Sequence, residues 1–115
     1  MGEIVKDREA VTTNGRAVFY AAMWEDFRRT ALNNGWALAL HGSLASDMDI
    51  MAMPWTIDAV ATKDLIESLR NLFSIPEKIK IIETRNIGSH NRIVYTMAIW
   101  GDFYIDISVI GDVLK

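Results

Sequence analysis

The sequence predicts an α+β domain in which a mixed sheet of about five strands carries two main helices on one side. Helix-like and strand-like segments follow one another in the order helix, two strands, helix, three strands. Half of the 115 residues are hydrophobic, which is enough for one buried core and argues against a disordered chain. We therefore expect a single domain over residues 15–115, preceded by an N-terminal arm over residues 1–14.

The two helices are expected over residues 15–34 and 62–74. In the first, four apolar residues recur at i, i+4, i+7 and i+11, the spacing of one helical face. They are Tyr20, Trp24, Phe27 and Ala31. The second helix carries a similar apolar stripe, with Thr62 as the expected N-cap and Pro76 preventing continuation. The residues of that stripe are Leu65, Ile66, Leu69, Leu72 and Phe73.

Five apolar or alternating segments are expected to form strands. They are residues 36–40, 47–53, 78–85, 92–100 and 103–110. Gly101-Asp102 is typical of a tight hairpin turn between the last two strands. In the last strand, phenylalanine, isoleucine and valine alternate with polar residues, which predicts one buried and one open face.

Charge and composition exclude several function classes. The net charge of −3 argues against a nucleic-acid binder that relies on a broad basic patch. The absence of cysteine excludes disulfides and thiolate zinc sites. Neither an apolar signal-peptide core nor an apolar run of ~20 residues is visible, so we expect no membrane contact and a cytoplasmic location.

Three aspartates stand in strand-like surroundings. Asp47 and Asp49 are spaced i, i+2 and therefore point the same way on a strand. Asp106 lies between Ile105 and Ile107, where aspartate is disfavoured. If the two strands are neighbours, the three carboxylates converge and need a cation such as Mg²⁺ or Mn²⁺ to offset their repulsion. A turn role for Asp47 and a solvated sheet face for Asp106 are the simpler alternatives.

The turn before the aspartates adds a second signal. Backbone N–H groups and a hydroxyl at Gly42-Ser43 suit a phosphate, although Gly-Ser is also an ordinary turn. Together, Gly42-Ser43, Asp47-Met48-Asp49-Ile50 and Tyr104-Ile105-Asp106-Ile107 resemble the signature of the nucleotidyltransferase superfamily, the DNA polymerase beta-like fold. The resemblance covers residues 16–110 and extends to small uncharacterised phage and prophage proteins of this fold.

The resemblance implies an activity and a set of roles. The activity is transfer of a nucleoside monophosphate from an NTP to an acceptor hydroxyl. By this similarity Gly42 and Ser43 contact phosphate, and Asp47, Asp49 and Asp106 bind Mg²⁺ or Mn²⁺. Asp106 is also the implied base for the incoming hydroxyl.

One departure from the family pattern keeps a second reading open. Family members usually place a short helix and loop between Gly-Ser and the aspartate pair, whereas here only Leu44-Ala45-Ser46 intervene. Three residues are too few for a helical turn and a loop. The alternative is a catalytically inactive nucleotidyltransferase-like module that acts through a protein partner, as an antitoxin or phage accessory protein does. A structural or regulatory phage protein without any ligand is the third reading.

Overall fold

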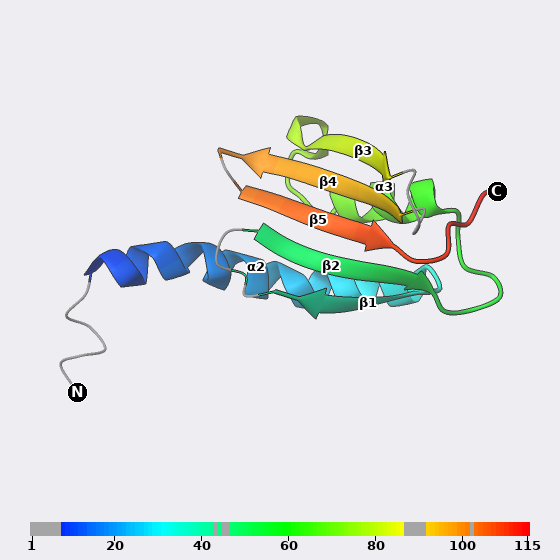
Figure 1. Cartoon of the computed structure of the whole chain (residues 1–115), viewed down its shortest axis with the longest axis horizontal. Coiled ribbons are helices and arrows are strands. Elements are labelled where there is room, and N and C mark those ends of the chain that lie inside the picture. Colours follow the sequence, from blue (N-terminus) through cyan, green and yellow to red (C-terminus); the bar gives the residue numbers. More distant parts are fainter. Residues whose placement is uncertain (1–7, 43, 45–46, 87–91, 102) are drawn as a thin grey trace.

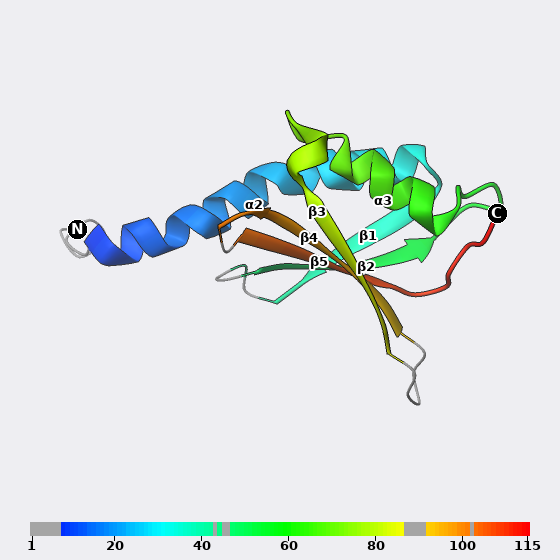
Figure 2. The same cartoon turned by 90° about the horizontal axis from the view of Figure 1, so that it is seen from above.

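The computed structural model describes residues 8–42, 44, 47–86, 92–101 and 103–115, and it confirms an α+β architecture with a five-stranded mixed sheet. Both main helices lie on one side of the sheet (Figures 1 and 2). The elements are α2 (Arg8–Asn33), β1 (Trp36–His41), β2 (Asp47–Pro54), α3 (Thr62–Arg70), the short 3₁₀ helix η1 (Pro76–Lys78), β3 (Lys80–Asn86), β4 (Arg92–Trp100) and β5 (Phe103–Val109).

The strand order is β1-β2-β5-β4-β3, so β5 lies in the centre of the sheet (Figure 1). It pairs antiparallel with β4 and parallel with β2. The chain between β2 and β5 contains α3, β3 and β4, which supplies the long crossover that a parallel pair requires. The pairing therefore brings two segments that are far apart in the sequence side by side.

Alternation along β2 and β5 separates a buried face from an open one. Met48 and Ile50 of β2, and Ile105 and Ile107 of β5, are fully buried beneath the helices. Each such aliphatic side chain contributes about 1.5–3 kcal/mol through burial. From the helices, the sheet is covered by fully buried side chains that include Tyr20, Phe27, Leu65 and Leu69. The polar residues that alternate with these strand residues are left on the opposite, uncovered face.

α2 begins at Arg8, seven residues before the expected start. Residues 8–14, assigned to an arm from the sequence, are therefore helical, and the rest of that arm lies outside the described residues. Gly15 inside the helix costs about 1 kcal/mol relative to alanine, which is too little to end it. The N-terminal part of α2 extends beyond the sheet (Figure 1).

α3 ends at Arg70, before the expected Ser74. Leu72 and Phe73 continue in tight turns, with their N–H groups donating to Leu69 and Arg70. Phe73 still reaches the core, because its ring meets Phe27 edge-on with 6.1 Å between centroids.

Thr62 does not cap α3 as expected, because the N-cap position belongs to Ala61. Thr62 is instead the first helical residue and is 1% exposed. Its hydroxyl donates to Asp112 Oδ1 at 2.5 Å and accepts from the Val113 N–H at 2.8 Å. Thr62 therefore ties the segment after β5 to the start of α3.

We predict that Thr62→Val lowers the free energy of unfolding by about 1–3 kcal/mol, because the Val113 N–H loses its acceptor at a part-buried position. Urea denaturation measures the loss. Thr62→Ser keeps the hydroxyl and is expected to lose less than half as much. Equal stability of the valine variant and the wild type would contradict this role.

Candidate functional site

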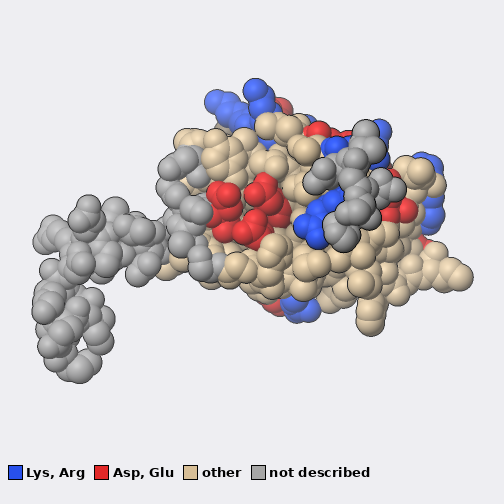
Figure 3. Space-filling view, viewed as in Figure 1, with Lys and Arg blue, Asp and Glu red and all other residues tan. Residues whose placement is uncertain are grey.

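The aspartates predicted from the sequence lie on the same, uncovered face of the sheet. In the parallel pairing of β2 with β5, Asp49 is the register partner of Asp106, and Asp47 is the partner of Tyr104. Asp47, Asp49 and Asp106 are all half-buried, and they alternate with buried residues, so they share one face. Figure 3 shows the resulting group of acidic side chains over β2 and β5.

The geometry brings the carboxylates together without a complete metal cage. Neighbouring strands lie about 4.8 Å apart, so Asp49 and Asp106 stand next to one another. Among the residues that the structure describes, no group of three or more histidine or acidic side chains is arranged to hold a metal ion. The open face therefore offers adjacent carboxylates that additional oxygen ligands would have to complete.

A row of register partners crosses the sheet through this pair. It runs from β1 to β3 as His41, Asp49, Asp106, Thr96 and Ile82. Thr96 Oγ1 donates to Asp106 Oδ1 at 2.6 Å. This bond holds one oxygen of Asp106 from the β4 side. Sequence reasoning did not identify Thr96.

Gly42 lies directly against the same group. Its φ is +84°, a conformation that favours glycine, and a Cβ added there would lie 3.0 Å from Asp49 Oδ2. The structure therefore places Gly42 beside Asp49, while its contact with phosphate remains a prediction. Ser43, the other expected phosphate contact, lies outside the described residues.

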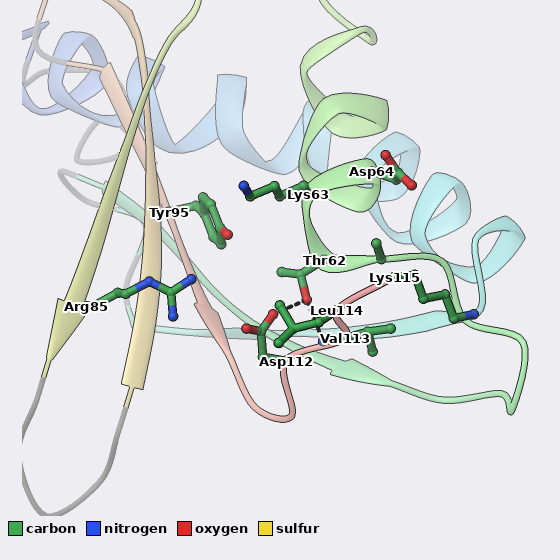
Figure 4. A pocket seen from close by; sticks show the side chains of 10 residues that line it. Thr62, Lys63, Asp64, Arg85, Tyr95, Asp112, Val113, Leu114 and Lys115 are labelled. Carbon is green, nitrogen blue, oxygen red and sulfur yellow. Dashed lines mark hydrogen bonds between the residues drawn. The ribbon is translucent and has the colours of Figure 1, made fainter.

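A separate cavity of about 420 Å³ lies on the helix side of the sheet, at the start of α3 (Figure 4). Charges of both signs line it, among them Lys63, Arg85 and Asp112. Burial raises the pKa of the Tyr95 hydroxyl in its wall, and the Glu83 carboxylate raises that pKa further. Arg85 Nε also lies 2.7 Å from Glu83 Oε2, so its charge is already paired.

No protein-family profile matches the sequence, and no curated protein is significantly similar to it. Within the described residues, no helix is both long and apolar enough to span a bilayer.

We predict that Gly42→Ala destabilises the protein more than Gly101→Ala. Both glycines have positive φ, where an L-residue costs about 1–2 kcal/mol. Only the Cβ at position 42 also meets a carboxylate, because nothing lies within 4 Å of a Cβ at Gly101. Thermal or urea unfolding of the two variants measures the difference. Equal losses of unfolding free energy would show that the alanine Cβ at position 42 does not crowd the Asp49 carboxylate.

Proposed function

We propose that this chain is a metal-dependent nucleotidyltransferase that moves a nucleoside monophosphate from an NTP to an acceptor hydroxyl in the cytoplasm. The observation that supports the proposal is the parallel β2–β5 register, which aligns Asp49 with Asp106 and keeps Asp47 on the same open face. The apolar faces of β2 and β5 fix this register, but they do not require aspartate at the facing positions, where like charges at this spacing repel.

The donor set fits a hard divalent cation. Mg²⁺ is usually bound through one or two carboxylates together with water and substrate phosphates, and seldom by a cage made of protein alone. Asp47, Asp49 and Asp106 would hold Mg²⁺ or Mn²⁺, and the NTP phosphates would supply the remaining oxygens. When bound, the cation neutralises phosphate charge and lowers the pKa of the attacking hydroxyl.

Residues of this chain position the reacting groups and accept the proton. The acceptor oxygen attacks the α-phosphorus, the bond to pyrophosphate breaks, and the hydroxyl proton passes to Asp106 as general base. Thr96 holds Asp106 Oδ1, which leaves the second carboxylate oxygen for this role. The missing side chain of Gly42 keeps space beside Asp49, where a phosphate would bind. The second proposed phosphate contact, Ser43, lies outside the described residues.

Cation binding is the first test. We expect isothermal titration calorimetry to show Mn²⁺ binding to the wild type, strengthened by a non-hydrolysable NTP. Asp49→Asn and Asp106→Asn are expected to weaken it about tenfold or more, because each removes a ligand charge. Asp26→Asn, on the exposed surface of α2, is the matched control and should bind as the wild type does. A wild type that binds no Mn²⁺, with or without nucleotide, would contradict the proposal.

Thr96 provides a finer test. Thr96→Val removes the hydrogen bond to Asp106 while keeping the side-chain shape, and we expect Mn²⁺ affinity to fall about tenfold. Thr96→Ser restores the hydroxyl and should restore most of the affinity. If the valine and serine variants bind Mn²⁺ equally, the hydrogen bond does not position Asp106.

The second candidate is an inactive nucleotidyltransferase-like module that acts through a protein partner. Only four residues, 43–46, separate Gly42 from Asp47, which leaves no room for the helix and loop that cradle a triphosphate in the family. Under this candidate, aspartate-to-asparagine changes on the open face leave the function in cells intact. Changes at the partner-binding surface then abolish it.

A further inference from the structure

We infer that the chain forms a two-fold symmetric dimer in which β1 pairs antiparallel with β1 of a second copy, joining the two sheets edge to edge. This inference is independent of the proposed function. It rests on the contrast between the two edges of the sheet and on the side of α2 that lies next to β1.

The two sheet edges differ in how they are protected. Strand order places β1 at one edge and β3 at the other. β3 carries Lys80, Glu83 and Arg85, and charged side chains are a common means of blocking edge-to-edge pairing. β1, with the sequence WALALH, has neither Lys, Arg, Asp or Glu nor proline along its six residues. Its regular register with β2 also contains no bulge that would turn the edge away.

The side chains of β1 suit pairing with an identical strand. Ala37 and Ala39 share the open face, and both are small. Leu38 and Leu40 lie on the helix side, and both are only half-buried within one copy. In an antiparallel pair about a two-fold axis, side chains on the same face stand opposite one another. Depending on the register of the pair, an alanine faces an alanine or His41 on the open face. On the helix side, a leucine then faces a leucine or Trp36.

The helix α2, which contacts β1, has a partly exposed flank. Phe19 and Met23 of α2 line a groove with the turn after α3, so that side of α2 faces α3. Five other residues of α2 follow i, i+4, i+7, i+11 and i+15, and thus form a flank directed away from that groove. They are Ala17, Ala21, Trp24, Arg28 and Leu32.

This α2 flank can contact its own copy. It is apolar apart from Arg28; Trp24 packs partly against the core, and Leu32 is 44% exposed. The Glu25 carboxylate accepts from Arg28 at 2.9 Å, so both signs of charge are present beside the flank. Where a two-fold axis passes between these residues, Arg28 of one copy faces Glu25 of the second copy, so opposite charges meet across the contact. Stable dimers bury at least about 1,200 Å² in total, which requires the helix flank in addition to the strand pair.

The oligomeric state in solution tests the inference. Light scattering after size exclusion is expected to give twice the mass of the chain for the wild type. Ala39→Lys adds a charge to the exposed open face of β1 and should raise the dimer dissociation constant about tenfold or more. Thr84→Lys places the same side chain on β3, at the opposite edge, and should remain dimeric. Circular dichroism confirms that both variants are folded.

A second experiment keeps the test decisive if Ala39→Lys fails to fold. Because the sequence has no cysteine, Ala37→Cys, Ala39→Cys and Thr84→Cys each introduce a single thiol. Three samples are oxidised mildly: Ala37→Cys alone, Ala39→Cys alone, and an equal mixture of the two. At least one of them is expected to give a disulfide-linked dimer. Thr84→Cys should not cross-link. A wild type that stays monomeric, or a dimer that neither Ala39→Lys disrupts nor these β1 cysteines link, would overturn the inference.

Discussion

The parallel pairing of β2 with β5 is the constraint on which the rest of the structure depends. It stacks Met48 beside Ile105 and Ile50 beside Ile107 under the helices, and the same register places Asp49 beside Asp106 on the opposite face. A slip of one residue along either strand would exchange the two faces of that strand and bury a carboxylate in the core. The apolar core and the acidic group are therefore specified by one pairing, and the hydrophobic side enforces the position of the charged side.

Much of this could be predicted from the sequence, because alternation is local. The faces of β2 and β5 follow from residues that alternate with a period of two. Burial alternates as predicted over residues 47–53 of β2, Met53 included, and over residues 104–109 of β5. The sequence alone therefore predicts on which face of its strand each of Asp47, Asp49 and Asp106 lies. That β2 and β5 are neighbours was only a hypothesis, since strand partners depend on the whole topology.

The remaining features depend on contacts between residues far apart in the sequence or on small differences in free energy. A simple two-residue turn would continue the Trp100–Phe103 pairing and put Met97 opposite Asp106. An irregularity between Ala98 and Trp100 shifts the register by one and brings Thr96 there instead. The predicted start of α2 is wrong by seven residues, because the helix continues through Gly15, where glycine costs only about 1 kcal/mol relative to alanine. The close approach of Gly42 to Asp49 follows from the pairing of the neighbouring His41 with Asp49, which short-range patterns do not specify.

The uncovered face is the feature that links fold to function, because a parallel strand pair is usually covered on both sides. Here the uncovered side carries carboxylates, and their shared use of one cation is the central claim. Amide NMR spectra recorded during a Mn²⁺ titration test it most directly, since the paramagnetic ion broadens only nearby signals. We expect signals of residues 47–51 and 104–108 to broaden together at the lowest Mn²⁺ concentrations. Broadening centred on another acidic surface, such as that of Asp64 and Asp112, would contradict it.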